Sequence, residues 1–339
     1  DYEDRACLAW HLWINKDGEL QNYKVVRGLM QSKASLTYEQ VQTARDGQPD
    51  AVTAPLMNKV INPLYDAYEA LSKAREARGT LTFESAERKI LTDKDENVTR
   101  IETYDRGDSH KVVEEFMILT NVASDLLGAS IKRVHEAPPS EQKIAQLKEM
   151  LEDAGIKPGT LETAADFTRV LQQAKGKPEY DMIAQNVLRA QAKACYSTRN
   201  VGHFGLALSK YAHSTSPIRR DSDLVVHRNL IALHQLGDGG VMPDKAKSEI
   251  VAEHLSETEI LSSRAERDAK DRLTAKFLVA SIGNTFTGEI RSINQVGLFV
   301  SLDGIGASGL LPMKSLSKAA NEYFHLNEDK QILRGNKSG

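Results

Sequence analysis

The sequence predicts an α+β protein with a helix-rich part over residues 1–283 and a smaller β-rich part over residues 284–339. Two observations predict this division. Up to about Gly283 the apolar residues mostly recur at three- and four-residue steps, which is typical of amphipathic helices. After Gly283 they recur at every second residue, which is typical of strands. At 339 residues the chain can bury more than one hydrophobic core.

The chain is predicted to start with a β-hairpin. Residues 7–14 and 21–30 have the composition of strands. The segment Asn15-Lys16-Asp17-Gly18 between them has the composition of a tight turn.

A helix is predicted from Ser109 to beyond Leu127. Two adjacent carboxylates, Glu114 and Glu115, lie on it. Glu115 shares a face with Ile118 and Leu119, so Glu115 is predicted to point inward.

Two further helices are predicted downstream. Ser140 is expected to cap a helix that ends at Gly155. A long helical segment follows Pro243, and residues 256–259 (Ser-Glu-Thr-Glu) are interpreted as a capping box that restarts the helix. Glu266 lies on the second half of that segment, four residues before Lys270, which predicts an ion pair.

Beyond Gly283, two neighbouring antiparallel strands are predicted. If the aliphatic side chains between positions 296 and 302 fill the inside of a small barrel, Phe299 must lie on the other face of the strand, toward solvent and beside Arg291. A nucleobase would give the exposed ring a flat partner. Packing of Phe299 under a loop is the alternative.

The most informative segment is TSPIRR, residues 215–220. Ser216 is predicted to be the N-cap of a helix, with Pro217 at the first helical position. Arg219 and Arg220 would then face an anion together with the free amides of the first turn, which predicts a phosphate site.

The residues that follow predict how the two arginines divide their roles. Arg219, Asp223 and His227 recur at four-residue intervals and are expected to pair along one helical face. That arrangement leaves Arg220 as the freer phosphate ligand. Taken singly, His213 and His227 are ordinary interior histidines, whereas within this segment they favour a buried polar network.

Composition restricts the classes of function. The 44 basic and 47 acidic residues give a net charge of −3, so binding of nucleic acid requires local clustering of cations. Cys7 and Cys195 have no disulfide or zinc spacing, which fits a reducing compartment. No apolar stretch has the length of a signal or membrane segment. The protein is therefore expected in the cytoplasm, without a membrane partner.

The stretch GHFGLAL to HR, residues 202–228, resembles the signature of the RNB family of exoribonucleases, the RNase II and RNase R group. Residues 78–84 (RGTLTFE), 112–121 (VVEEFMILTN) and 262–268 (SSRAERD) occur in the order that family shows. Residues from Phe286 onward resemble the family's RNA-binding OB fold of the ribosomal protein S-one type, without its last strands. The expected fold is therefore a helix-rich RNB catalytic domain with a mixed β-sheet, followed by a partial OB-fold β-barrel.

The resemblance implies a function: processive 3′-to-5′ hydrolysis of single-stranded RNA to nucleoside 5′-monophosphates with Mg²⁺. It implies catalytic roles for Arg220, Arg219, Glu266 and Glu115. It implies RNA contacts from Phe83, Tyr211, His213, Thr215, Ser216, Asp223, His227 and Phe299. The expected partner is the 3′ end of single-stranded RNA, bound by a monomer.

The sequence departs from the family pattern in three ways. The family's cluster of metal-binding aspartates is not visible in this sequence, so an inactive fragment of a longer enzyme is expected, with Mg²⁺ belonging to the parent protein. Ser214 and Asp221 stand where the family usually has aromatic residues. Asp221 could draw a guanidinium away from phosphate, although it is also a favourable residue for the first turn of a helix.

Two alternatives remain open. One is an RNB-like protein that binds RNA without catalysis, and the other is a helical interaction scaffold. The sequence does not separate the RNase II and RNase R subgroups, and it does not identify the physiological RNA.

Overall fold

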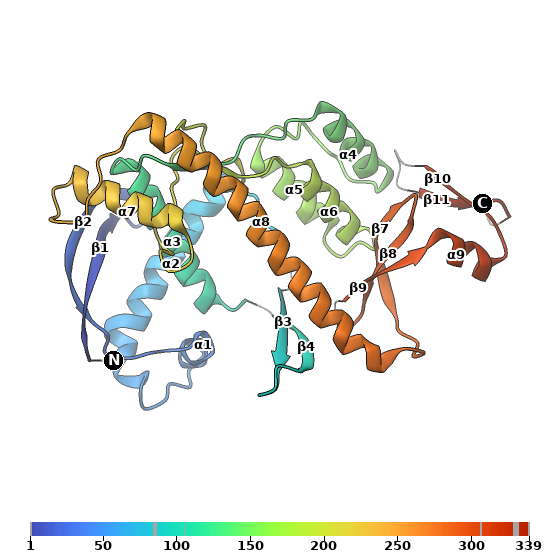
Figure 1. The fold of residues 1–339 in the computed structure, drawn as a ribbon, viewed down its shortest axis with the longest axis horizontal. Coiled ribbons are helices and arrows are strands. Elements are labelled where there is room, and N and C mark those ends of the chain that lie inside the picture. Colours follow the sequence, from blue (N-terminus) through green and yellow to red (C-terminus); the bar gives the residue numbers. More distant parts are fainter. Residues whose placement is uncertain (1, 84–86, 105, 306, 328–331, 338–339) are drawn as a thin grey trace. The chain divides into compact units, whose positions relative to one another are not determined.

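The computed structural model describes residues 2–83, 87–104, 106–305, 307–327 and 332–337. The helices (Figure 1) are α1 (Tyr38–Arg45), α2 (Asn62–Arg78), α3 (Asp108–Leu126), α4 (Glu141–Asp153), α5 (Ala164–Ala174), α6 (Tyr180–Ala190), α7 (Asp221–Leu233), α8 (Lys245–Leu278) and α9 (Met313–Ala320). The strands are β1 (Asp4–Ile14), β2 (Leu20–Gln31), β3 (Glu87–Thr92), β4 (Val98–Tyr104), β5 (Lys132–Val134), β6 (Cys195–Ser197), β7 (Gly288–Asn294), β8 (Gly297–Leu302), β9 (Ser308–Pro312), β10 (Phe324–Asn327) and β11 (Ile332–Gly335). Short helical turns are η1 (Ala54–Leu56), η2 (Met57–Ile61), η3 (Phe204–Leu206) and η4 (Val279–Ser281).

The chain divides into two compact units. Unit 1 comprises Asp1–Leu81, Arg106–Glu136 and Lys193–Ile260, and unit 2 comprises Thr82–Asp105, Ala137–Ala192 and Leu261–Gly339. The predicted α+β class is confirmed, because helices and antiparallel strands occur in both.

The predicted N-terminal hairpin is confirmed in unit 1. Strands β1 and β2 pair antiparallel, with Cys7 opposite Gly28. The turn closes through a hydrogen bond from the Gly18 amide to the Asn15 carbonyl, and Gly18 has a φ of 76°. One face of the hairpin packs on α7, since Val25 lies in one buried cluster with Val226 and Leu230.

Helix α3 lies next to α2 and to the hairpin. It ends at Leu126, so the prediction that it runs past Leu127 is wrong by a residue or two. The Leu127 amide closes the last turn on the Ala123 carbonyl, and the chain then reverses at Gly128, which has a φ of 106°.

Helix α8 is continuous, and the predicted restart of the helix at residues 256–259 is wrong. The Ser256 hydroxyl donates to the Ala252 carbonyl 2.8 Å away instead of capping a new helix. The same hydroxyl oxygen accepts the Tyr196 amide at 2.9 Å. Ser256 therefore fastens strand β6 to α8, in a buried cluster that contains Tyr196, Ala252 and Leu255.

Unit 2 contains a helical group made of α4, α5 and α6, shown in green in Figure 1. The predicted cap of α4 is confirmed, because the Ser140 hydroxyl accepts the Lys143 amide. The chain turns at Gly155 with a φ of 69°. Phe167 and Val170 of α5 are completely buried with Ile183 and Val187 of α6.

The C-terminal part of unit 2 contains the predicted antiparallel strands, with β9 as a third strand in the order β7-β8-β9. The predicted alternation along β8 is not strict. Phe299 is half-buried rather than solvent-facing, and it lies opposite Ser292 and Leu310. Arg291 falls at a register shift in β7 and pairs with Asp181 of α6.

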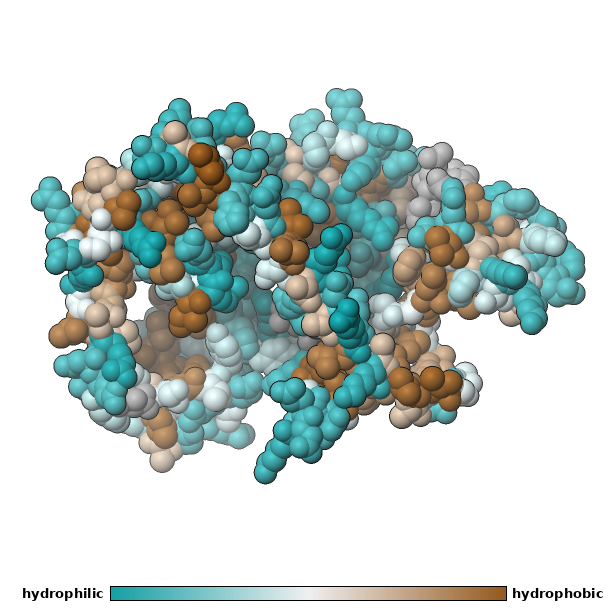
Figure 2. Space-filling view, viewed as in Figure 1, coloured by the Kyte–Doolittle hydropathy of each residue, from teal (hydrophilic) through white to brown (hydrophobic). Residues whose placement is uncertain are grey.

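In the view of Figure 2, hydrophilic residues are interspersed with separate patches of hydrophobic ones. Within the described residues, no helix is both long enough and apolar enough to cross a bilayer.

Candidate phosphate-binding site

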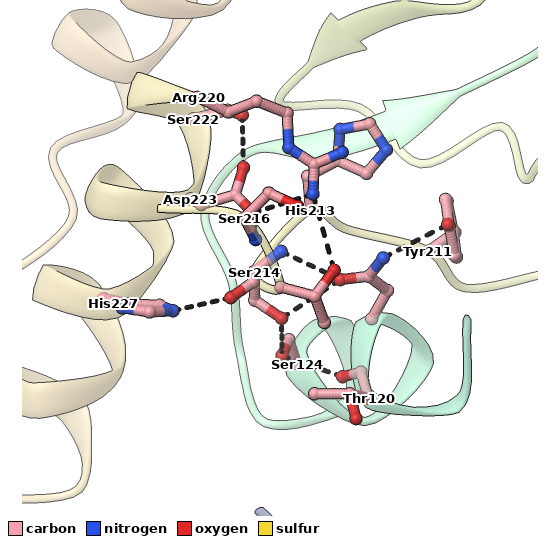
Figure 3. A network of polar contacts seen from close by, with 12 residues as sticks. Thr120, Ser124, Tyr211, His213, Ser214, Ser216, Arg220, Ser222, Asp223 and His227 are labelled. Carbon is pink, nitrogen blue, oxygen red and sulfur yellow. Dashed lines mark hydrogen bonds and ion pairs between the residues drawn. The ribbon is translucent and has the colours of Figure 1, made fainter. Parts of the chain in front are cut away.

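The candidate site is built on residues 211–220, which run between α3 and α7 in unit 1 (Figure 3). Polar side chains of α3 bind the backbone of this segment. The Tyr211 amide donates to Asp125 Oδ2 at 2.8 Å, and the Ser214 amide donates to Asn121 Oδ1 at 2.8 Å. Asn121 and Asp125 are 2% and 4% exposed, so these bonds form away from water and fix the path of the segment.

Ser214 fits this environment, although it departs from the family pattern. Its side chain is 1% exposed, and its hydroxyl lies 2.7 Å from the hydroxyl of Ser124 on α3. Its carbonyl lies 2.7 Å from His227 Nε2. A serine here satisfies polar groups of α3 that an aromatic side chain would leave unpaired.

Ser216 and Pro217 do not start a helix, contrary to the prediction. The Ser216 carbonyl accepts the amides of Arg219 and Arg220, so residues 216–220 form a separate turn. Helix α7 begins at Asp221, with Arg220 in the N-cap position. The Ser216 amide donates to Asp223 Oδ1 at 2.7 Å, which ties the turn to the first turn of α7.

The predicted ion pair between Arg219 and Asp223 is also wrong. Arg220 Nη2 lies 2.8 Å from Asp223 Oδ1, and Arg220 is 17% exposed. Arg219 is exposed, and His227 binds Ser214 rather than Asp223. The helix starts four residues later than predicted. The partner of Asp223 is therefore Arg220, three residues before it, and not Arg219, four residues before it.

Arg220 keeps donors for a ligand despite its ion pair. Its Nε is buried and has no hydrogen-bond partner among the described residues. Its Nη2 reaches the Thr215 hydroxyl only at 3.5 Å. A guanidinium that one buried carboxylate orients, and that retains unused N–H donors, is suited to bind an anionic oxygen.

His213 lies in a ring-lined, cationic environment next to Arg220 (Figure 3). Its Nδ1 is 2.9 Å from the Tyr196 hydroxyl, and the ring lies edge-on to Tyr196 and Tyr211. Burial lowers the pKa of His213 to about 2, and the positive charges of Arg220 and Arg133 act in the same direction. The imidazole is therefore neutral near pH 7.

Tyr196 and Arg133 complete this environment. The Arg133 guanidinium lies over the Tyr196 ring at 4.8 Å from its centroid and also pairs with Glu259 of α8. Burial raises the pKa of the phenols of Tyr196 and Tyr211, so both remain protonated. Asn121 Nδ2 donates to the Tyr211 hydroxyl at 3.2 Å.

The prediction that Glu115 rather than Glu114 points inward is confirmed. The side chain of Glu115 is 5% exposed and that of Glu114 is 37% exposed, and both pair with Arg75 of α2. Glu115 lines a cavity of about 620 Å³ in unit 1, together with Arg78, Leu119 and the hairpin turn at Gly18. The Nε of Arg78 is also buried and finds no partner among the described residues.

Other predicted site residues belong to unit 2. Phe83 is half-buried, and the neighbouring Glu84 of the predicted motif lies outside the described residues. Glu266 is exposed on α8, where its predicted ion pair with Lys270 is confirmed at 2.6 Å. Unit 1 thus brings together the predicted site residues between positions 211 and 227. Phe83, Glu266 and Phe299 belong to unit 2.

The sequence prediction missed several members of the network. Tyr196, Ser222 and Ser124 were given no role, and Asn121 was only assigned to the helix. One signal was present: Asn121, Ser124 and Asp125 are polar residues in the mainly apolar second half of α3. Tyr196 carried no such signal, because its partners His213 and Ser222 lie 17 and 26 residues away in sequence.

Two family models match the chain. The RNB domain matches residues 1–235, and the S1 RNA binding domain matches residues 280–337. The RNB match covers more than half of the chain, so the protein belongs to the RNB family. The prediction made from residues 202–228 is thereby confirmed.

The relatives within that family are ribonuclease R proteins. Ribonuclease R of Escherichia coli (strain K12) is 34% identical over 354 residues, which cover 99% of this chain and 43% of that protein. The structure of the apo form of Mycoplasma genitalium RNase R has a TM-score of 0.90 at 25% identity, covering 99% of this chain and 54% of that one. The same RNase R in complex with ribose methylated single-stranded RNA gives a TM-score of 0.89 at 25% identity, with the same coverage. The chain thus spans less than half the length of the E. coli relative.

The described residues do not fit a metal ion. Within the described residues, no group of three or more His, Cys, Asp or Glu side chains is placed to hold one.

Proposed function

We propose that this RNB-family protein, in its full-length form, is an exoribonuclease that hydrolyses single-stranded RNA from the 3′ end, processively, to nucleoside 5′-monophosphates. The ribonuclease R relatives and the matched RNB and S1 domains support the class of reaction. The Mycoplasma genitalium RNase R complex supports single-stranded RNA as the ligand.

One observation within the chain carries the proposal: the environment of Arg220. Its guanidinium is held by the buried carboxylate of Asp223, yet its Nε is buried without a partner among the described residues. A buried donor of this kind is available to a ligand. A phosphate oxygen would accept from it, and the contact would strengthen as negative charge develops on that oxygen during hydrolysis.

The remaining predicted residues have supporting roles in this proposal. Arg219, exposed on the turn, attracts the RNA backbone. Tyr211, Thr215, Ser216 and His227 fix the segment that carries Arg220. Phe83 and Phe299 stack on bases, while Glu115 and Glu266 lie near the terminal nucleotides. Residues 284–339 serve as the RNA-binding domain, and residues 1–283 as part of the catalytic domain.

We also propose that the full-length protein requires Mg²⁺ and acts as a monomer in the cytoplasm. Metal-assisted phosphodiester hydrolysis uses carboxylate-bound Mg²⁺ to neutralise charge on the phosphate. The described residues supply cations for that phosphate but no metal-binding cluster. Both cysteines are free thiols in the structure, which supports a reducing compartment.

The test is a product analysis with the full-length protein. A 3′-labelled oligoribonucleotide in Mg²⁺ should release labelled nucleoside 5′-monophosphate from the first turnover, and EDTA should stop the release. The alternative of an inactive RNA-binding protein predicts salt-dependent RNA binding with no release. An interaction scaffold predicts neither binding nor release, and either outcome would refute the proposal.

A further inference from the structure

His135, which follows strand β5 directly, binds the loop that opens residues 202–228. Its amide donates to the Gly202 carbonyl at 3.0 Å, and its carbonyl accepts the Phe204 amide at 2.7 Å. Its Nδ1 lies 3.0 Å from the Gly205 amide. Three hydrogen bonds thus join this one residue to the loop that contains η3.

The direction of the side-chain bond is fixed, because a backbone amide can only donate. His135 Nδ1 is therefore an acceptor, and the neutral ring carries its proton on Nε2. The approach is close, since a Cβ on Gly205 would lie 3.0 Å from His135 Nδ1. A second imidazole repeats the arrangement one residue further on, where His203 Nδ1 accepts the Leu206 amide at 3.2 Å. The two rings lie edge-on with their centroids 5.1 Å apart.

The carbonyls of the same loop residues hold the segment that follows α2. The Gly205 carbonyl accepts the Leu81 amide at 2.8 Å. The Thr80 hydroxyl lies 3.2 Å from the Leu206 carbonyl, and Thr80 is 4% exposed. Gly205 is therefore bound on both sides, at its amide by His135 and at its carbonyl by Leu81.

This anchored segment leads to Phe83, which stands two positions after Leu81 in the chain. Each residue has only two soft backbone dihedral angles, so an anchor at Leu81 restricts the path of the chain into Phe83. Removing the imidazole of His135 takes the acceptor from the Gly205 amide, which costs the loop a part-buried hydrogen bond. The displacement reaches Leu81 through the carbonyl of the same glycine.

We propose that His135 is a positioning residue, which holds Leu81 through Gly205 and thereby fixes the backbone from which Phe83 stacks on a base. His203 supports the same loop at the next residue. The inference rests on the proposed function, in which Phe83 stacks on bases, and it gives neither histidine a contact with the RNA.

A double-mutant cycle with Phe83 tests the proposal. The affinity of the full-length protein for a single-stranded oligoribonucleotide is measured in EDTA, without hydrolysis. Phe83→Ala should weaken binding about tenfold, as expected for the loss of one stacked base. His135→Leu, which removes the acceptor, should weaken binding about fivefold in the natural background and less than about twofold in the Phe83→Ala background. Equal losses in the two backgrounds would overturn the proposal, as would natural affinity in Phe83→Ala.

Rescue by a conservative variant separates the acceptor from the bulk of the ring. His135→Asn places an amide oxygen near the position of Nδ1, so its affinity should stay within about twofold of the natural value. His234→Leu is the matched control and should change nothing, because that exposed ring donates to the Leu127 carbonyl. A loss in His135→Asn as large as that in His135→Leu would refute a role for the acceptor. If His135→Leu does not fold, the same cycle is completed with His203→Leu, whose loss should likewise depend on Phe83.

Hydrogen exchange followed by mass spectrometry gives a readout that needs no RNA. In His135→Leu, peptides that cover residues 78–83 and 202–208 should both exchange faster, whereas peptides from α4 to α6 should not. Faster exchange over residues 202–208 alone would contradict the link from Gly205 to Leu81. A natural protein that binds RNA but releases no nucleotide would refute the proposed exoribonuclease function separately, since the affinity cycle involves no hydrolysis.

Discussion

Two neighbouring arginines, Arg219 and Arg220, have different environments. Arg220 turns inward because Asp223 is completely buried and its Oδ1 needs a cationic partner, whereas Arg219 remains exposed on the same turn. Breaking a buried pair by removing one member leaves an uncompensated charge. The structure therefore distinguishes a cation held by a buried carboxylate, Arg220, from an exposed one, Arg219.

Two largely buried histidines predict a pH dependence of stability. Burial lowers the pKa of His203 to about 3 and that of His213 to about 2, from an ordinary value of 6.5. Below pH 6.5 the unfolded chain binds protons that the folded chain does not, so the free energy of unfolding falls as the pH decreases from 6.5. Each histidine should account for about 2 kcal/mol of loss by pH 5.

Denaturant unfolding of the purified protein at pH 7 and pH 5 measures this loss. His203→Asn keeps a good cap for η3, whose Leu206 amide donates to His203 Nδ1, and should reduce the difference by about 2 kcal/mol. The exposed His11 provides the control, since His11→Gln should leave the difference unchanged. Equal stability at the two pH values would contradict the inferred burial of these rings.

At the residue scale, the sequence predicted which residues gather but not how they pair. Ser216, Asp223 and His227 do lie in one network with Arg220. The pairing depended on where α7 begins, and Pro217 after Ser216 is as compatible with a turn as with a helix start. Because the predicted start of α7 was four residues too early, Arg219 instead of Arg220 was predicted to pair with Asp223.

At the element scale, local signals predicted some elements well and misled at others. The turn at Gly18 and the Ser140 cap depend on residues within a few positions of one another, and both were predicted. Ser256 has the same local sequence as a helix cap, yet its partner Tyr196 lies 60 residues away. Sequence windows contain no information on such a contact, so the continuous course of α8 could not be predicted.

The hairpin turn gives an element-scale prediction. A Cβ on Gly18 would lie 2.2 Å from the Ala70 carbonyl oxygen of α2, and its φ of 76° disfavours other residues. Gly18→Ala should therefore lower the free energy of unfolding by about 3 kcal/mol. Gly28→Ala on β2 is the matched control, because a Cβ there meets nothing within 4 Å.

Thermal or denaturant unfolding of the two glycine variants decides the point. The control should change stability by less than about 0.5 kcal/mol. A Gly18→Ala protein as stable as the Gly28→Ala protein would show that the turn does not pack on α2 as described.

At the scale of the whole molecule, the proposed RNA binding has to occur on a chain with a net charge of −3. Affinity then depends on a few clustered cations and should fall steeply as salt increases. Arg219→Ala should reduce the slope of log affinity against log salt by about 0.7, the value for one phosphate contact on a single strand. Lys16→Ala, at the hairpin turn, should leave the slope unchanged.

Fluorescence titrations of the full-length protein with single-stranded RNA over a range of salt concentrations measure these slopes. An Arg219→Ala protein with the natural slope would exclude this exposed arginine as a phosphate contact. The loss should be similar for RNAs of different sequence, because phosphate contacts carry no sequence information.

Arg220 is proposed to act on the scissile phosphate, and a comparison of Arg220→Ala with Arg219→Ala in the full-length protein separates this role from simple RNA binding. Single-turnover hydrolysis and RNA affinity are measured for both variants. Arg220→Ala should slow hydrolysis by about 10²–10³-fold while weakening RNA binding less than tenfold, because contacts made in the transition state act selectively on rate. Arg219→Ala should mainly weaken binding. Equal losses of rate and affinity in Arg220→Ala would contradict the account.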